Sequence, residues 1–273
     1  MKLAEALEIV VRSDPGRVRT HNEDAVFADP ALGLAVLADG MGGYNAGEIA
    51  SGMATAVLAN NFGRFLPTWT AGAAGFADPA FANRHLQGEV EAANRAIHQA
   101  AQSQPQYQGM GTTLVAAWFY DNHLSVAHVG DSRLYRWRGG ELTVLTRDHS
   151  FLQEQIDSGL ISEADARRSQ NRNLVTRALG VDPELEVDVQ DLAVEVGDLL
   201  LLCSDGLNDM LEDGEIALAL QTLGSNLPLA ADQLIEMAND QGGHDNVSVI
   251  LIRVRGDFTV NRSWWQKIRA WFA

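Results

Sequence analysis

The chain has 273 residues, of which 46% are apolar and 21% are charged, a composition typical of a soluble globular protein with a full core. No stretch reaches the roughly 20 apolar residues of a membrane span, and residues 1–16 lack the apolar core of a signal peptide. The formal net charge is −16, and residues 181–252 hold 16 Asp and Glu but no Lys or Arg, which disfavours nucleic acid as a partner.

Apolar runs of strand character recur along the chain. They predict β-strands at residues 7–11, 32–38, 112–119, 123–130, 132–138, 199–203 and 247–254. Alternation within these runs, as in Leu124-Ser125-Val126-Ala127-His128-Val129, fits half-buried antiparallel strands. Asp121-Asn122 lies between two of the runs and predicts a hairpin turn.

Helical patterns occupy most of the remaining chain. They predict helices at residues 46–63 and 82–103, one or two short helices within 148–169, and two more within 212–240. Pro67 to Pro79 is rich in Ala and Gly and is predicted to be a loop. Strands followed by helix pairs and then by more strands favour a layered α+β domain over βαβ units, and no linker divides it.

Four aspartates lie at the edges of strand-like runs, each with a glycine nearby: Asp39, Asp131, Asp205 and Asp245. Each Asp-Gly pair by itself is typical of a turn. A rigid strand that ends in a carboxylate is also how a β scaffold builds a site for hard cations. Four such strand ends in one chain predict several metal ions in one cleft. The acidic 181–252 stretch is then either a solvated surface or part of a field that holds cations.

An N-terminal cluster adds a basic residue to this set. Glu23 and Asp24 point to opposite faces if the segment is extended, so one can face a metal while the other orients water. Arg19 precedes them, and its guanidinium suits bidentate recognition of phosphate. A surface ion pair is the alternative for this cluster.

Taken in order, the motifs resemble those of the metal-dependent protein phosphatases of type 2C, above all the bacterial single-domain serine/threonine phosphatases. The resemblance covers residues 8–254. It rests on Arg-x-x-Asn-Glu-Asp at 19–24, Asp-Gly-Met-Gly-Gly at 39–43, Gly-Met-Gly-Thr-Thr at 109–113, Gly-Asp-Ser-Arg at 130–133, Ser-Asp-Gly-Leu at 204–207 and Asp-Asn at 245–246. It implies a four-layer αββα sandwich, with two antiparallel sheets flanked by helix pairs and a metal cluster at one edge.

The resemblance also implies a role for each site residue. Asp39 bridges two Mn²⁺ or Mg²⁺ ions, and the Gly40 carbonyl completes one coordination sphere. Asp205 and Asp245 hold the other ion, and Asp131 with Asp205 forms a third, weaker site. Glu23 and Asp24 ligate a metal or act through bound water, and Arg19 holds the substrate phosphate.

The expected chemistry follows from these ligands. An all-oxygen set selects Mg²⁺ or Mn²⁺ over Zn²⁺, and a water shared by two such ions can attack phosphorus in line. Cys203 lies in an apolar run, so we predict a buried, reduced thiol that is a poor nucleophile. Met41 stands where many eukaryotic members carry a histidine proposed as general acid. A metal-bound water would replace it, with His21 and His244 as weaker alternatives.

Two segments lie beside or beyond the motifs. Residues 148–180 correspond to the flap of bacterial members, and Arg167, Arg168 and Arg172 either read a phosphopeptide or form a solvated helix face. We divide the chain into a catalytic domain at 1–256 and a Trp-rich amphipathic tail at 257–273. The tail either packs on its own domain, docks to a partner or lies on a membrane surface.

The sequence therefore predicts a cytoplasmic, Mn²⁺- or Mg²⁺-dependent protein serine/threonine phosphatase. We expect it to be a monomer that acts on phosphorylated Ser/Thr proteins and opposes a bacterial Ser/Thr kinase. The alternatives are a non-catalytic phosphoprotein-binding regulatory module and a small-molecule phosphomonoesterase.

Overall fold

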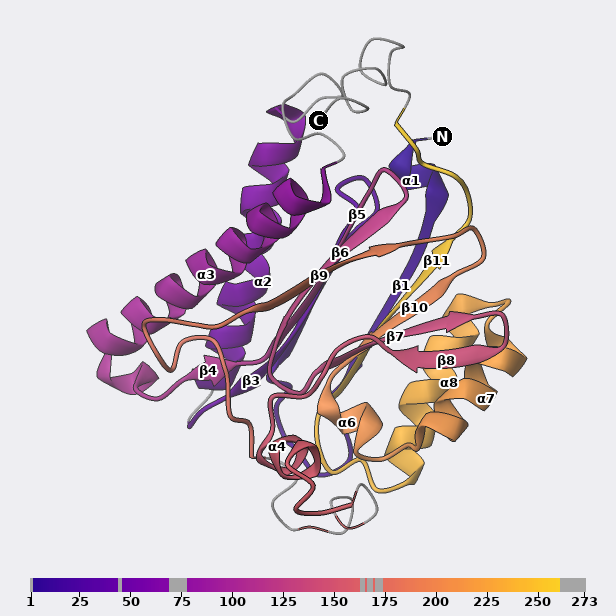
Figure 1. Cartoon of the computed structure of the whole chain (residues 1–273). Helices are drawn as coiled ribbons and strands as arrows, with labels where there is room; N and C mark the ends of the chain where they lie inside the picture. Colours follow the sequence, from indigo (N-terminus) through magenta and orange to yellow (C-terminus); the bar gives the residue numbers. More distant parts are fainter. Residues whose placement is uncertain are drawn as a thin grey trace.

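Two antiparallel sheets lie face to face, and a pair of helices covers the outer face of each sheet (Figure 1). The computed structural model describes residues 2–43, 46–68, 78–162, 165, 169 and 174–260. Within these residues the arrangement is the expected α+β four-layer αββα sandwich, so the fold prediction is confirmed. No described helix is both long and apolar enough to cross a membrane.

The first sheet has the strand order β2-β3-β5-β6-β9, and the short β4 pairs with β3. Its strands are β2 (Asp24–Asp29), β3 (Leu34–Met41), β4 (Gly111–Thr112), β5 (Leu114–Tyr120), β6 (His123–Val129) and β9 (Asp188–Ala193). Its outer face is covered by α2 (Ala46–Phe65) and α3 (Pro79–Ser103), which are followed by the 3-10 turns η1 (Leu66–Thr68) and η2 (Pro105–Tyr107).

The second sheet has the order β1-β11-β10-β7-β8. Its strands are β1 (Leu7–Asp14), β7 (Arg133–Arg138), β8 (Glu141–Val144), β10 (Leu199–Cys203) and β11 (Val247–Val254). Its outer face is covered by α7 (Asp213–Leu223) and α8 (Leu227–Asp240). Three short helices lie outside these layers: α1 (Leu3–Ala6), α4 (Phe151–Asp157) and α6 (Asp205–Asn208).

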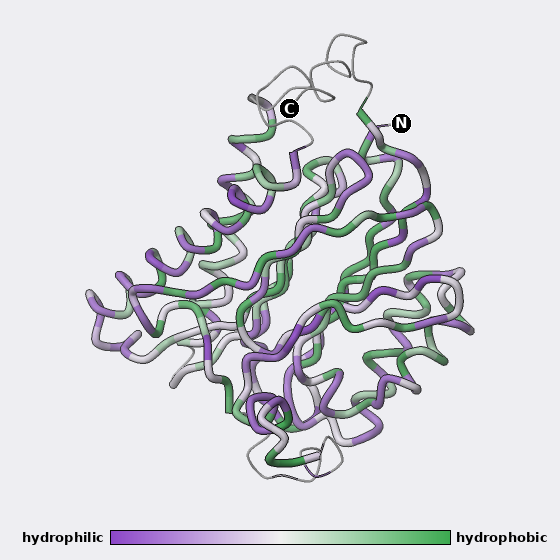
Figure 2. Tube along the Cα trace, in the orientation of Figure 1, coloured by the Kyte–Doolittle hydropathy of each residue, from purple (hydrophilic) through white to green (hydrophobic). Residues whose placement is uncertain are grey.

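Three apolar cores separate the four layers, and β5 shows how one strand serves two of them. All seven residues of β5 are buried. Alternate side chains nevertheless face opposite ways: Trp118 packs beneath the helices, whereas Val115 and Phe119 pack against the second sheet. Figure 2 shows the same division along the trace, with hydrophobic strands inside and alternating hydrophilic and hydrophobic turns along α3.

The predicted hairpin turn is confirmed. Asp121 and Asn122 have φ angles of 44° and 60°, the left-handed pair that a type I′ turn needs. Tyr120 and His123 pair across it, so β5 and β6 are adjacent and antiparallel. Asn and Asp tolerate this backbone region better than other non-glycine residues do.

The structure adds strands that the apolar runs did not predict. β2, β8 and β9 contain no fully buried residue, and β2 and β9 each begin with an aspartate, so their hydrophobic signal is weak. The predicted strand at 112–119 is divided into β4 and β5. The helix predicted from residue 82 begins at Pro79, because the Asp78 side chain caps it by accepting from the Ala80 amide and Pro79 suits its first turn.

Some predictions lie outside the described residues. These include most of the predicted loop (residues 69–77), the three flap arginines Arg167, Arg168 and Arg172, and tail residues 261–273. The part of the tail before residue 261 is described, and there Phe258 is 5% exposed and packs against Phe119.

Trp118 gives a test of the packing beneath the helices. It is fully buried, and its ring meets Phe62 edge-on with the centroids 5.0 Å apart. We expect Trp118→Ala to lower the free energy of unfolding by about 3–5 kcal/mol, because the site cannot collapse fully. Urea denaturation measures this. The matched control is Val196→Ala at a side chain that is 61% exposed, which should change the value by less than about 0.5 kcal/mol. Equal effects of both substitutions would contradict the packing described.

Candidate metal centre

Five aspartates meet at the edge of the sandwich where strands of both sheets begin or end. Asp24 opens β2 and pairs in register with Asp39 near the end of β3. Asp131 follows β6, Asp205 follows β10 as the first residue of α6, and Asp245 precedes β11. The charges of the other four all act on the Asp39 carboxyl. The structure thus brings together the four strand-edge aspartates of the sequence and adds Asp24 beside them.

This concentration of acids changes their pKa values. Burial is the main reason that the pKa of Asp39 lies well above its usual range, and the neighbouring carboxylates raise it further. The pKa of Asp205 is raised well above its usual range for the same two reasons. Burial likewise raises the pKa of Asp24 to about 6 and that of Asp131 to about 7. The protein therefore holds carboxyl groups where it is costly to charge them all without a compensating cation.

Two oxygen atoms of the cluster show that a cation fits. The Oδ1 atoms of Asp24 and Asp205 are buried and have no hydrogen-bond partner among the described residues. Such an atom costs about 1–3 kcal/mol when it remains unsatisfied. Carboxylate oxygens are the ligands that Mg²⁺ and Mn²⁺ prefer, and no cysteine or histidine belongs to this cluster. The donor set therefore suits hard divalent cations.

Hydroxyl groups on neighbouring residues hold the Asp24 carboxylate and the Asp39 backbone in place. Ser204 Oγ donates to Asp24 Oδ2 at 2.8 Å and accepts from the Ser248 amide at 3.0 Å. The Asp39 amide donates to Thr113 Oγ1 at 3.1 Å, and Thr112 Oγ1 donates to the Asp39 carbonyl at 2.8 Å. Ser204, Thr112 and Thr113 lie within the sequence motifs, but the sequence predicted no role for them. The one indication of a role was their position next to the aspartates and glycines.

Asn246 is a second residue whose role the sequence did not reveal. Its amide group donates to the carbonyls of Pro15 at 3.0 Å and His21 at 2.9 Å, and its Oδ1 accepts from the Glu23 amide at 2.8 Å. One side chain that is 5% exposed thus fixes the whole loop before β2 against the start of β11. It sets where Arg19, Glu23 and Asp24 can lie.

Two glycines are required by close approach of the backbone. A Cβ on Gly40 would lie 2.2 Å from the Gly47 carbonyl oxygen, and one on Gly206 would lie 2.0 Å from the Asn246 carbonyl oxygen. Both distances are too short for any side chain. Gly40 therefore follows Asp39 because the start of α2 passes directly over the strand end.

Arg19 and Glu23 lie at the solvent side of the cluster. Arg19 Nη2 donates to Asp245 Oδ2 at 2.7 Å while half of the arginine side chain stays exposed. Burial raises the pKa of Glu23, and the charge of Arg19 opposes that rise. The two adjacent acids have different neighbours. Asp24 accepts a hydrogen bond from Ser204, whereas the charges of Arg19 and Asp245 act on the Glu23 carboxyl. His21 and His244 are both exposed.

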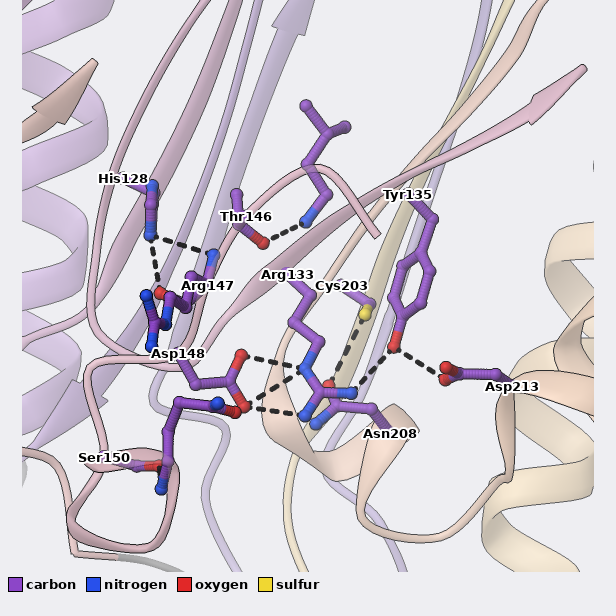
Figure 3. A network of polar contacts seen from close by, with 12 residues as sticks. His128, Arg133, Tyr135, Thr146, Arg147, Asp148, Ser150, Cys203, Asn208 and Asp213 are labelled. Atoms are coloured by element: carbon purple, nitrogen blue, oxygen red, sulfur yellow. Dashed lines mark hydrogen bonds and ion pairs between the residues drawn. The ribbon is translucent and has the colours of Figure 1, made fainter. Parts of the chain in front are cut away.

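A partly buried ion pair supports the turn that carries Asp131. Arg133 and Asp148 form a bidentate pair, with Nε to Oδ1 at 2.8 Å and Nη2 to Oδ2 at 2.7 Å (Figure 3). Arg133 Nη1 also donates to the Tyr135 hydroxyl at 3.0 Å. Cys203 is drawn in the same view; it is buried and free of a disulfide, its Sγ donates to Asn208 Oδ1 at 3.6 Å, and burial raises the pKa of its thiol to about 12. The prediction of a buried, reduced thiol is confirmed, and this thiol cannot serve as a nucleophile near neutral pH.

A separate histidine cluster is already satisfied by the protein. His128, His149 and Asp188 offer ligand atoms within 4.8 Å of one another. However, Arg177 Nη1 lies 3.2 Å from Asp188 Oδ1, and His128 Nε2 donates to the Arg147 carbonyl at 2.8 Å. A cation here would displace an arginine and meet its charge. The five-aspartate cluster is the better metal site.

Known proteins are similar to this chain in sequence. The sequence profile of the family described as protein phosphatase 2C matches residues 17–246. The chain is 38% identical over 244 residues to the serine/threonine phosphatase Stp of Listeria welshimeri, covering 88% of this chain and 93% of that protein. It is 41% identical over 248 residues to the serine/threonine protein phosphatase PstP of Mycobacterium tuberculosis, covering 91% of this chain but 45% of PstP.

Solved structures agree with the sequence comparisons. A crystal structure of M. tuberculosis PstP superposes with a TM-score of 0.82 at 39% identity, covering 92% of this chain and 99% of that one. A structure of the PstP catalytic domain in complex with two manganese ions has a TM-score of 0.79 at 39% identity, with the same coverage. Sequence and fold lead to one conclusion: this chain belongs to the protein phosphatase 2C family.

Proposed function

We propose that this protein hydrolyses phosphoserine and phosphothreonine in other proteins, using two Mn²⁺ or Mg²⁺ ions and a third, weaker site. The observation that carries the proposal is the pair of buried, unpartnered carboxylate oxygens of Asp24 and Asp205 inside a cluster of five aspartates. The names of the relatives, serine/threonine phosphatase Stp and PstP, support it. So does the pair of manganese ions in the PstP structure.

The carboxylates would hold the cations. Asp39 and the Gly40 carbonyl would help to hold the paired ions, Asp205 and Asp245 would hold the second ion, and Asp131 with Asp205 would hold an ion at the third site. Glu23 and Asp24 would ligate an ion or act through water bound to it, and the unpartnered Oδ1 of Asp24 is available for either role. When bound, such ions supply activated water and neutralise charge on the phosphoryl group.

The chain's own residues would carry the remaining steps. The Arg19 guanidinium, half exposed beside Asp245, is placed to bind phosphoryl oxygens as they gain charge. The Cys203 thiol is not a candidate nucleophile near neutral pH, since it is buried and its pKa is raised to about 12. Met41 cannot donate a proton, so we assign protonation of the leaving hydroxyl to water.

The proposal also covers the cellular setting and the domain organisation of the protein. A bacterial Ser/Thr kinase would supply the phosphoproteins that this enzyme dephosphorylates. A buried free thiol supports a reducing, cytoplasmic compartment. We propose a monomer with a catalytic domain at 1–256 that includes the 148–180 flap and is followed by a tail at 257–273. Packing of Phe258 on Phe119 supports a tail whose first residues lie against the domain.

Metal removal and two aspartate substitutions test the centre. We expect EDTA, Asp39→Asn and Asp205→Asn each to lower hydrolysis of p-nitrophenyl phosphate by at least roughly 10²-fold, because each removes charge stabilisation. Mn²⁺ should raise the melting temperature of the parent protein and raise it less in both variants. Without metal, the variants should be at least as stable as the parent, since each relieves repulsion among buried carboxylates. Asp240→Asn, at an exposed position of α8, is the control. Full activity in EDTA would exclude the metal mechanism.

Asn246 tests how the loop before β2 is positioned. We expect Asn246→Ala to leave three partners unsatisfied and to raise the Mn²⁺ concentration for half-maximal activity by roughly tenfold, as changes beside metal ligands do. Measuring activity against Mn²⁺ concentration checks this, and Asn239→Ala, a substitution of another buried asparagine, serves for comparison. A variant that folds and keeps the parent's Mn²⁺ dependence would show that Asn246 does not position the ligands.

A further inference from the structure

A pocket with acidic walls opens beside the metal centre. Its cavity volume is about 210 Å³. Its lining combines apolar and acidic side chains: Met41, Val181, Leu185, Asp182, Glu184 and Glu186. We call this set the acidic pocket. It belongs to the acidic 181–252 stretch, of which only Asp205 and Asp245 are used by the metal centre.

The acidic pocket is within reach of a substrate bound at the metals. Met41 lies two residues beyond Asp39 on β3, so both side chains lie on the same face, roughly 7 Å apart along the strand. Thr112 connects the wall opposite Met41 to strand β3. Its hydroxyl donates to the Asp39 carbonyl at 2.8 Å, and its amide donates to the Leu179 carbonyl at 3.1 Å.

The wall that carries the acids is held firmly. Asn94 of α3 is 1% exposed, and its amide group donates to the Asp182 carbonyl at 3.0 Å. The Gly180 amide donates to Asn94 Oδ1 at 2.7 Å. Gly180 has φ of +88°, and a Cβ there would lie 2.3 Å from Ile97 Cγ2, so the turn is packed directly against the helix. The carboxylates of the wall are therefore presented in a defined place.

The charges of the wall leave two acids unpaired. Arg177, the one basic residue that lines the pocket, lies 3.2 Å from Glu186 Oε2 and 3.2 Å from Asp188 Oδ1. Asp182 and Glu184 are exposed and have no ion-pair partner in the described part of the chain. An extended peptide advances about 3.3 Å per residue. A side chain two residues from the phosphorylated one would therefore reach this pocket.

We propose that the acidic pocket binds a lysine or arginine side chain of the phosphoprotein, about two residues from the phosphorylated serine or threonine. This proposal rests on the proposed phosphatase function and names its substrate class. Met41, Val181 and Leu185 would contact the aliphatic part of the basic side chain, while Asp182 and Glu184 pair with its charged end. A small phosphomonoester does not extend into the pocket.

Phosphothreonine peptides test this choice. One peptide series carries Lys, Ala or Glu at each position within three residues of the phosphothreonine, and kcat/KM is measured at low and high salt. For the parent we expect Lys to be favoured over Ala by roughly fivefold at one position near two residues away, mainly through KM, as two exposed ion pairs allow. High salt should reduce this ratio.

Variants locate the preference. In Asp182→Asn/Glu184→Gln the Lys-to-Ala ratio should fall to about one, and Glu184→Lys should favour the Glu peptide. Glu141→Gln, at an exposed residue of β8 outside the pocket, should keep the parent's ratio. Thermal unfolding verifies that each variant is folded.

The outcomes separate the two proposals. If the parent does not hydrolyse p-nitrophenyl phosphate with Mn²⁺, the proposed phosphatase function fails. If it does so but shows no preference for Lys, or keeps that preference in the double variant, the acidic pocket is not a substrate site. A preference of the parent for Glu would instead assign recognition to Arg177 and overturn the proposal.

Discussion

Repulsion among five neighbouring carboxylates is the constraint on which the rest of this structure depends. Asp24, Asp39, Asp131, Asp205 and Asp245 come from five separate segments. Burial and then the charges of the other four raise the pKa of Asp39. An unfolded chain would let them separate, so the folded protein must hold them by other means. The fold supplies this through neutral side chains whose hydrogen bonds do not depend on the aspartates' charge. Asn246 and Thr113 are examples.

The sandwich architecture makes such a centre possible. Strands β2 and β3 belong to one sheet, whereas β10 and β11 belong to the other. Only where the two sheets come together at one edge can carboxylates from both face the same space. The close passage of Gly40 against Gly47, and of Gly206 against Asn246, shows how little room remains there. Rigid strands and close backbone contact together hold the ligands ready before any cation arrives.

Acidic side chains also lie outside the five-aspartate cluster. Asp182 and Glu184 lie on the wall of a pocket whose opposite side is Met41, two residues from Asp39. Exposed carboxylates beside a phosphate-binding site reduce the electrostatic attraction between that site and the phosphate. We therefore infer that these carboxylates have a separate function. Recognition of a basic residue in the substrate offsets this loss, because the same negative field attracts the basic side chain of the peptide. Arg19 is the positive group that we propose to bind the phosphoryl oxygens.

The sequence by itself determined much of this protein. Apolar alternation located the long inner strands, Asp121-Asn122 marked the hairpin turn, and glycines beside strand-edge aspartates pointed to a cation site. These signals are local, since a strand face, a turn and an adjacent glycine depend on neighbours in the chain.

Only the tertiary structure decided the rest. The half-buried strands β2 and β9 form by pairing with central strands, and their own hydrophobic signal is weak. The role of Asn246 needs partners more than 220 residues earlier in the chain. The acidic pocket joins residue 41 to residues 175–186. Contacts between distant segments leave no periodic mark in the sequence, because they exist only once the two sheets have packed.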